Sequence, residues 1–252
     1  MNKFKSIFLG LEIAYGQYQP GERGSNGKQQ GKAFIVRQDV TDELWTNHLE
    51  GKGPALGIIP ITENNDCRWG CIDIDEYNFD HASLVKVIRN YKLPLIVCRS
   101  KSGGAHVFLF TKENIPASLM QSKLREIAII LGYEGSEIFP KQTQLTKDPE
   151  TGIIKPGQFI NLPYYGGQRR AINIDGTFFT LEQFIKVVDA NITTTDDLKS
   201  LTEEMEKQSM EGVDEDFLEG PPCLALISKI SNQSGFDGKD RFMYNYHVFV
   251  KM

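Results

Sequence analysis

The stretch WGCIDIDEYNFDHASLVKVIRNYKLPLIVCRSKSGGAHVFLF, residues 69–110, decides the fold. Its first seven residues alternate between the two sides of an extended chain, which is typical of a strand. After Asp80, a suitable N-cap, apolar residues recur at helical spacing up to position 91. Residues 95–98 and 106–110 are two further strands, separated by a turn at Gly103-Gly104. The stretch therefore predicts the order strand, helix, strand, strand.

The next thirty residues complete the pattern. Apolar residues at helical spacing predict a second helix, and Glu137–Phe139 reads as a fourth short strand. The order β-α-β-β-α-β is the split βαβ arrangement of ferredoxin-like and RRM-like domains. We therefore predict an α+β fold whose central sheet has the spatial order 4-1-3-2, so that the first strand lies between the third and the fourth.

The flanking segments give weaker signals. Phe8, Leu9, Leu11 and Ile13 suggest a short helix, and the Gly- and Gln-rich residues 16–32 predict a mobile loop before a strand at 33–36. After Pro140, the segments QFINLPYYGG, 171–174 and 178–179 predict additional sheet. Helices are expected near 181–189 and, in an acidic stretch, near 195–208.

Composition places the chain among ordinary globular proteins, with 252 residues, 40% hydrophobic and 24% charged. No apolar run approaches the ~20 residues that span a bilayer, and the N-terminus lacks the pattern of a signal peptide. We therefore expect no membrane association and a cytoplasmic location. Four scattered cysteines do not make a disulfide framework, and one CxxxC pair (Cys67 and Cys71) is too little for a zinc site.

Charge is unevenly distributed along the chain. Residues 179–220 carry a net charge of −9, so the remainder carries +4 although the whole chain carries −5. The acidic stretch is typical of a solvated helix and linker. The slightly basic remainder is compatible with a groove that follows phosphates.

An acidic pair on the first strand carries the clearest chemical signal. Asp73 and Asp75 point to one face and lie roughly 6–7 Å apart, so they repel each other unless a cation lies between them. Carboxylate oxygen is the ligand that Mg²⁺ and Mn²⁺ prefer. In the predicted sheet, Glu137 opens the neighbouring fourth strand and gives a third carboxylate, as a two-metal phosphoryl-transfer site requires. Glu134 is the alternative third ligand, and a plain acidic strand end is the alternative to a metal site.

The turn SKSGGAH supplies the complementary charge. Ser102, Gly103 and Gly104 form a tight turn where backbone can approach a phosphate, and Lys101 and His106 add donors. The alternative is an ordinary hairpin. Further candidates for nucleotide or template contacts are Lys141, Gln142, Asn161, the Arg169-Arg170 pair and Tyr77, which follows the acidic pair and could stack on a sugar.

These motifs together carry a resemblance to a known family. GCIDIDEY, SKSGGAHVFLF and SEIFPKQ followed by GQFINLPYYGG resemble the three motifs of the archaeo-eukaryotic primase superfamily, above all the primase-polymerases of phages and plasmids and the primases of TOTE conflict systems. The similarity spans about residues 4–190. It implies that Asp73, Asp75 and Glu137 are metal ligands, that His106 and Ser102 contact the phosphates of the incoming nucleotide, and that the sheet is the palm of a primase-type core.

The resemblance implies synthesis or extension of a primer on single-stranded DNA from deoxynucleoside or ribonucleoside triphosphates, with Mg²⁺ or Mn²⁺ as cofactor. The expected partners are template, primer and nucleotide; the sequence leaves open whether a helicase is fused or separate. If the source is a phage, the location is the bacterial host cytoplasm. Zinc-binding Cys/His clusters of many relatives are absent, which puts a zinc-assisted initiation step in doubt.

Three other functions are weighed against this one. A rolling-circle initiator needs an HxH pair, which none of the four histidines forms. A non-catalytic RRM-like module would bind single strands through aromatic residues on its central strands. An untemplated nucleotidyltransferase or cyclase would share the sheet and the paired carboxylates.

Domain organisation follows from the same observations. We predict a catalytic core over residues 1–190, an acidic helix and linker over 191–220, and the start of a truncated helical subdomain over 221–252. Since the missing part of that subdomain could assist initiation, primer extension is the expected activity of this chain.

Overall fold

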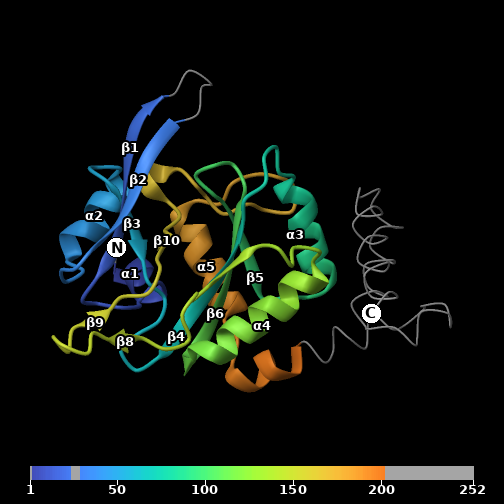
Figure 1. Ribbon diagram of the computed structural model, residues 1–252. Helices are drawn as coiled ribbons and strands as arrows, with labels where there is room; N and C mark the ends of the chain where they lie inside the picture. The colour runs from blue at the N-terminus through green and yellow to red at the C-terminus, as the bar shows by residue number, and fades with distance from the viewer. Residues whose placement is uncertain (1, 24–28, 202–252) are drawn as a thin grey trace, which may run out of the picture.

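The computed structural model describes residues 2–23 and 29–201 (Figure 1). The elements in chain order are α1 (Asn2–Ile7), β1 (Tyr15–Arg23), β2 (Gln29–Val36), α2 (Asp42–Glu50), β3 (Ala55–Ile58), β4 (Asp66–Ile74), α3 (His81–Asn90), β5 (Leu95–Arg99), β6 (Ala105–Pro116), α4 (Ala117–Ile130), β7 (Glu137–Phe139), β8 (Thr146–Lys147), β9 (Ile154–Lys155), β10 (Ile160–Asn161), the 3₁₀ turn η1 (Tyr165–Gly167) and α5 (Leu181–Asn191). The mixed α+β class predicted from the sequence is confirmed.

The main sheet has the strand order β5-β6-β4-β7. Its neighbouring strands are all antiparallel, and α3 connects β4 to β5 while α4 connects β6 to β7. Counted along the chain, the four strands have the spatial order 4-1-3-2. The helix predicted after Asp80 begins where expected, because the Asp80 side chain accepts a hydrogen bond from the Ser83 backbone N–H at 3.0 Å.

The two faces of this sheet pack against different layers, because successive side chains on a strand point to opposite sides. On β4, Ile72 and Ile74 belong to the cluster that contains the apolar faces of α3 and α4. Trp69 and Cys71 belong to a second cluster, formed with α1, α2, α5 and the strands β1, β3 and β10. Figure 1 shows α3 and α4 on the side of the sheet away from β1, β2 and β3. Asp73 follows the alternation of Cys71 and therefore faces the inner space between the two layers.

A second sheet, with strand order β10-β3-β1-β2, corrects the prediction of a mobile loop over 16–32. Most of that segment forms the antiparallel hairpin β1–β2, apart from residues 24–28, which lie outside the described part of the chain. Its glycines have a packing role that composition alone does not indicate. A Cβ on Gly16 would lie 2.0 Å from the Phe159 ring, and one on Gly57 of β3 would lie 2.2 Å from it. The ring packs directly on the backbone of two paired strands.

The N-terminal helix lies earlier than predicted. The chain is helical over Asn2–Ile7, and the expected helix at residues 8–13 is wrong. Phe4 and Phe8, four residues apart, are fully buried with ring centroids 5.1 Å apart. Beyond the helix, the Gly10 backbone packs so closely on Ile59 that a Cβ at position 10 would lie 2.1 Å from the Ile59 carbonyl oxygen. The Leu11 N–H instead donates to that oxygen at 2.9 Å.

The segments after Pro140 contribute little regular sheet. Ile160–Asn161 joins β3, whereas residues 171–178 make only the bridges Cys98–Ala171 and Ile172–Phe178. The helix predicted at 181–189 is confirmed as α5, which begins with a capping box at Thr180. Residues 195–201 are helical, and the rest of the predicted acidic helix, the linker and the C-terminal subdomain lie outside the described residues. Within residues 2–23 and 29–201, no helix is long and apolar enough to cross a membrane.

The three cysteines of the sheets are buried thiols. Cys67 and Cys71 point to opposite faces of the sheet, because a bulge lies between Cys67 and Trp69. They cannot share a metal ion. Burial raises the pKa of Cys67 to about 12 and raises the pKa of Cys71 well above its usual value, so both remain protonated.

His48 gives a stability prediction that depends on pH. Its Nδ1 accepts a hydrogen bond from the Leu56 N–H at 3.1 Å and its Nε2 lies 2.8 Å from the Pro163 carbonyl oxygen, so the bonded ring is neutral. Burial lowers its pKa to about 4. As the pH falls from 6.5 towards 4, the unfolded chain therefore takes up a proton that the folded chain does not. This residue should remove roughly 2–3 kcal/mol of stability between pH 7 and pH 4.5.

Urea unfolding of the wild type and of His48→Gln at the two pH values measures this difference. The variant should be less stable at pH 7, because it loses the contacts of His48 with the Leu56 N–H and the Pro163 carbonyl oxygen. Its stability should fall less than that of the wild type on acidification. If the free energy of unfolding falls equally in the two proteins on acidification, then protonation of His48 does not contribute to the pH dependence of stability.

Candidate active site

A row of polar residues crosses three strands of the main sheet. Asp73, next to the last residue of β4, lies opposite His106 of β6 on one side and opposite Glu137 of β7 on the other. Facing residues on antiparallel strands have Cα atoms roughly 4.5–5.5 Å apart. Asp75 follows two residues later, just beyond the end of β4. The structure thus places at one end of three neighbouring strands four residues that the sequence places up to 64 positions apart.

Asp73 is the most enclosed member of the row. Its side chain is 16% exposed, and His106 Nε2 lies 3.3 Å from its Oδ1. That contact is an ion-pair distance without hydrogen-bond geometry, so the buried Oδ1 has no hydrogen-bond partner among the described residues. A buried carboxylate oxygen is stabilised by a hydrogen bond or by a cation. This oxygen is therefore available to a ligand.

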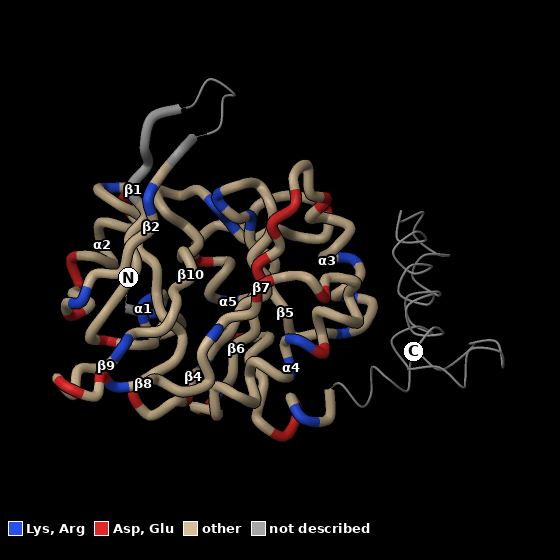
Figure 2. The backbone as a smooth tube through the Cα atoms, in the orientation of Figure 1, with Lys and Arg blue, Asp and Glu red and all other residues tan. Residues whose placement is uncertain are grey.

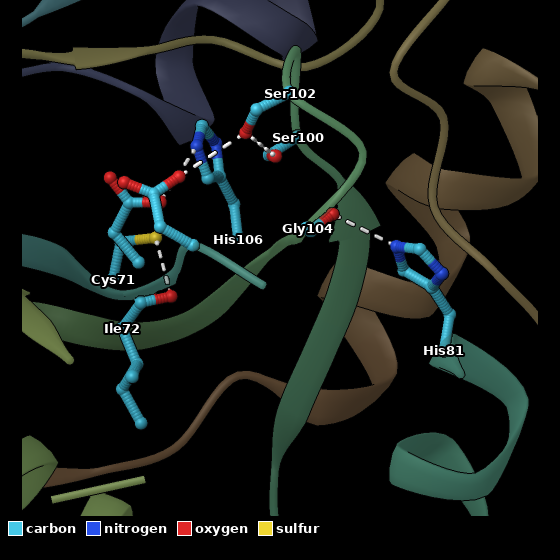
Figure 3. Close-up of polar contacts among 9 residues, drawn as sticks. Cys71, Ile72, His81, Ser100, Ser102, Gly104 and His106 are labelled. Atoms are coloured by element: carbon cyan, nitrogen blue, oxygen red, sulfur yellow. Dashed lines mark hydrogen bonds and ion pairs between the residues drawn. The ribbon is translucent and has the colours of Figure 1, made fainter. Parts of the chain in front are cut away.

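Asp75 is exposed and is held by the turn that follows β5. Its Oδ1 accepts a hydrogen bond from Ser102 Oγ at 3.2 Å, and Ser102 Oγ lies 3.0 Å from Ser100 Oγ. Figure 3 shows Ser100, Ser102 and His106 gathered on one side of the turn. The predicted donors Ser102 and His106 are thus adjacent to the predicted metal ligands.

Glu137 completes the carboxylate set and is 57% exposed. Lys141 Nζ lies 2.6 Å from its Oε1. The register of β7 places Glu137 opposite Asp73, whereas Glu134 precedes the strand, which favours Glu137 over Glu134 as the third carboxylate. Both glutamates line a pocket of about 340 Å³ together with Arg125 and Lys141.

The carboxylates of Asp73, Asp75 and Glu137 have the right chemistry for a hard divalent cation, although their oxygens do not converge on one point. Among the described residues, no three His, Cys, Asp or Glu side chains converge as a ready-made metal site. Lys141 holds Glu137, and Ser102 holds Asp75. The buried Oδ1 of Asp73 has no hydrogen-bond partner among the described residues, and Glu137 lies opposite it on β7 while Asp75 follows it on the chain. This set of carboxylate oxygens fits Mg²⁺ or Mn²⁺, whose binding would exchange the contacts of Lys141 and Ser102 for oxygen–metal bonds.

The Gly-rich turn is built against the end of β4. Gly103 has a φ of +99°, which favours glycine, and a Cβ on Gly104 would lie 2.0 Å from the Ile74 carbonyl oxygen. The Gly104 carbonyl oxygen accepts from the Ser100 N–H at 2.8 Å, and His81 Nε2 lies 2.9 Å from it (Figure 3). Gly104 thus has a structural reason to be glycine, and His81 of α3 holds the turn in place.

The remaining sequence candidates are more dispersed. Tyr77 is 71% exposed, and Lys101 Nζ lies 3.1 Å from the centroid of the Tyr18 ring. Asn161 is on β10 of the other sheet, and its buried Oδ1 has no hydrogen-bond partner among the described residues. Gln142 supports the backbone, because its Oε1 accepts from the Gln158 N–H at 2.7 Å. These contacts do not join Asn161 or Gln142 to the acidic row.

Sequence reasoning missed several residues at this end of the molecule. The contact of His81 with the Gly104 carbonyl oxygen has no signal in the sequence. Tyr18, Arg99 and Tyr165 line a second pocket with Lys101 and Arg169. They come from segments that only the packing of the two sheets brings together.

Comparison with known proteins decides the family. The model of the archaeo-eukaryotic primase domain of TOTE conflict systems matches residues 18–209. The chain belongs to this family. The matched range of this archaeo-eukaryotic primase domain includes every candidate residue discussed above, from Tyr18 to Arg169.

Two further comparisons are less informative. The primase-polymerase (AEP domain) of cyanophage S-2L has a solved structure that matches this primase domain at 10% identity and a TM-score of 0.37, over 73% of this chain and 94% of that chain. A comparison with curated proteins found no significant match.

Proposed function

We propose that this primase domain catalyses template-directed nucleotidyl transfer, joining nucleoside triphosphates to the 3′ end of a primer on single-stranded DNA. The observation that carries the proposal is the position of Asp73, which lies opposite Glu137 and His106 and has one buried oxygen without a hydrogen-bond partner in the described part of the chain. Membership of the primase family supports a nucleotidyltransferase in general. The four-stranded sheet that carries these residues would be its palm.

The carboxylates would hold the cofactor. Asp73, Asp75 and Glu137 would bind Mg²⁺ or Mn²⁺, which would neutralise the triphosphate and acidify the attacking 3′-hydroxyl. In the reaction the 3′ oxygen forms a bond to the α-phosphorus, the bond from that phosphorus to the bridging oxygen breaks, and pyrophosphate leaves while the hydroxyl proton passes to solvent.

The protein's own donors would orient the nucleotide. His106 Nε2 and Ser102 Oγ lie beside Asp73 and Asp75, so both can donate to phosphate oxygens close to those carboxylates. The backbone of Gly103 and Gly104, together with Lys101, would add donors along the triphosphate. Tyr77 and Asn161 are proposed as weaker contacts to the nucleotide.

The structure disfavours the main alternative, an RRM-like single-strand binder. Such modules stack bases on aromatic residues of the central strands. Here the aromatic residues of β6 on the corresponding face, Phe108 and Phe110, are 0% and 3% exposed, because the second sheet and α5 cover them. Bases cannot reach them without separating the two layers.

Incorporation of labelled nucleotides tests the proposed function. With Mg²⁺ or Mn²⁺ we expect extension of a primer annealed to single-stranded DNA, with products that follow the template sequence. Products independent of the template would favour an untemplated nucleotidyltransferase, and a cyclic nucleotide would favour a cyclase. Robust product without a primer would overturn the expectation that extension is the main activity.

Lys141 provides a prediction about cation dependence. Its ammonium group lies 2.6 Å from Glu137 Oε1 and would compete with a cation for that carboxylate. Lys141→Met should therefore lower the Mg²⁺ concentration for half-maximal activity by about two- to fivefold, because an exposed ion pair is worth up to about 1 kcal/mol. Lys123→Met, which removes the ion pair with Glu126 on α4, is the matched control and should leave the Mg²⁺ dependence unchanged. A higher Mg²⁺ requirement in Lys141→Met would contradict competition.

A further inference from the structure

One side chain of α3 holds the Gly-rich turn from the side opposite the carboxylates. Figure 3 shows the His81 ring on one side of the turn and Ser100, Ser102 and His106 on the other. His81 is the first residue of α3, and its Nε2 lies 2.9 Å from the Gly104 carbonyl oxygen. A carbonyl oxygen only accepts hydrogen bonds, so the proton is assigned to Nε2, which donates it. A hydrogen bond therefore connects α3 directly to the turn.

The orientation of the Gly104 carbonyl group is fixed by two donors. Its oxygen accepts from the Ser100 backbone N–H at 2.8 Å as well as from His81, so both of its lone pairs are used. Because the peptide bond is planar, a fixed carbonyl group also fixes the peptide unit that joins Gly104 to Ala105. Ala105 begins β6, the strand that carries His106. The bond from His81 thus constrains the junction between the turn and this strand.

His81 is itself held by contacts that do not involve the turn. Its ring packs edge-to-face on Phe79, with centroids 5.0 Å apart, and the Phe79 ring lies 5.9 Å from that of Tyr133. Asp80 caps the start of α3, because it accepts from the Ser83 N–H at 3.0 Å and from Ser83 Oγ at 2.7 Å. The donor therefore has a defined position before any ligand binds.

The contacts on the other side of the turn are weaker. Ser102 Oγ lies 3.2 Å from Asp75 Oδ1 and 3.0 Å from Ser100 Oγ, which is long for bonds between a hydroxyl and an oxygen. Gly103 and Gly104 add backbone freedom that other residues would not have. Figure 2 shows α3 to the right of the acidic segments at this end of the molecule. The tie to α3 is thus well placed to limit the conformations of the turn.

We propose that His81 is a positioning residue, which holds the turn in the conformation that binds the triphosphate of the incoming nucleotide. The proposal rests on the proposed function, because that function assigns the turn to the triphosphate. Without the bond from His81, the turn would bind nucleotide in only a fraction of its conformations, and the apparent dissociation constant would rise by the inverse of that fraction. A bound triphosphate would then hold the turn itself, so the rate of the chemical step would not change.

Two substitutions separate the hydrogen bond from the packing of the ring. Phenylalanine keeps an aromatic ring against Phe79 but has no donor, whereas the glutamine amide nitrogen is as many bonds from Cα as His Nε2 and can donate. His81→Phe should raise the KM for nucleotide about three- to tenfold, as expected for one lost hydrogen bond, and leave kcat within about twofold of the wild type. His81→Gln should restore the KM to within about twofold of the wild type. Primer extension at saturating primer–template and Mg²⁺ measures both constants.

Ser83→Ala is the matched control at the same end of α3. It removes the bond from Ser83 Oγ to Asp80 and leaves the contact of His81 with the turn intact. The KM for nucleotide should stay at the wild-type value. A rise as large as that of His81→Phe would show that the stability of α3 matters rather than the His81 bond, and would overturn the proposal. A lower kcat with an unchanged KM in His81→Phe would also overturn it.

Amide hydrogen exchange tests the turn without any catalysis. In the nucleotide-free protein, residues 99–106 should exchange faster in His81→Phe than in the wild type, and at the wild-type rate in Ser83→Ala. Unchanged exchange in His81→Phe would contradict a positioning role. If His81→Phe fails to fold by circular dichroism, His81→Leu replaces it, because leucine also lacks a donor.

Calorimetric titration with a deoxynucleoside triphosphate and Mg²⁺ separates this proposal from the proposed catalysis. His81→Phe should bind the triphosphate about three- to tenfold more weakly than the wild type. If that loss is found while the wild type extends no primer, the positioning role stands and the proposed catalysis fails. If the wild type binds no triphosphate, or if His81→Phe binds it equally well, the positioning role is wrong.

Discussion

Asp73→Asn should reduce nucleotide incorporation by at least roughly 10²–10³-fold, the usual effect of removing one electrostatic group from a reaction centre. The substitution keeps the shape of the side chain and removes its negative charge from the centre of the row. Asp73 lies directly between His106 and Glu137, so no other carboxylate can take its position. Steady-state primer extension with Mg²⁺ and with Mn²⁺ measures the effect.

The same variant should fold at least as well as the wild type. Asp73 is 16% exposed and its Oδ1 has no hydrogen-bond partner among the described residues, so the charge is held at a cost in stability. Urea unfolding should therefore show an unchanged or raised midpoint for Asp73→Asn. Asp189→Asn, which removes a surface carboxylate paired with Lys3, is the matched control and should keep full activity. Substantial extension by Asp73→Asn in manganese buffer would contradict the assignment of Asp73 as a metal ligand.

Gly104→Ala should damage both stability and activity. The new methyl group would lie 2.0 Å from the Ile74 carbonyl oxygen and 3.2 Å from the Glu76 nitrogen, so the turn or the end of β4 has to move. Overpacking of this kind costs about 1–3 kcal/mol. The same movement would separate Ser102 from Asp75, and we expect activity to fall by at least about tenfold, equivalent to roughly 1.4 kcal/mol.

Urea unfolding and primer-extension kinetics measure the two effects of Gly104→Ala. Gly132→Ala is the control, because Gly132 has a φ of +79° but no atom within 4 Å of its Cβ position. It should cost about 1 kcal/mol of backbone strain and leave the kinetics unchanged. A Gly104→Ala enzyme with wild-type kinetics would show that the contact of the turn with β4 does not position the site.

The central sheet was predictable because its signals are local. Alternation in residues 69–75, the cap at Asp80 and the apolar spacing of α3 and α4 each arise within one segment, and the structure places these elements close to the predicted bounds. The hairpin β1–β2 was not predictable in the same way. Its Gly16 is required by the Phe159 ring, which comes from a segment more than 120 residues away.

The prediction of a helix over residues 8–13 was wrong for a related reason. Apolar residues continue past Ile7, so local spacing allowed a helix over 8–13. The Gly10 backbone instead packs against the Ile59 carbonyl oxygen, which excludes a helical course there. A contact between distant segments overrode the local pattern.

The features of the candidate site likewise fall into those that local sequence predicts and those that depend on tertiary packing. The sequence by itself determined which residues carry the carboxylates and the Gly-rich turn, because chemical identity and strand alternation are written locally. Only the tertiary structure decided that Lys141 holds Glu137, that His81 supports the turn and that Arg169 turns its guanidinium into a pocket with Arg99 and Lys101. Such contacts depend on the packing of two sheets and on the course of loops, and no spacing along the chain encodes either.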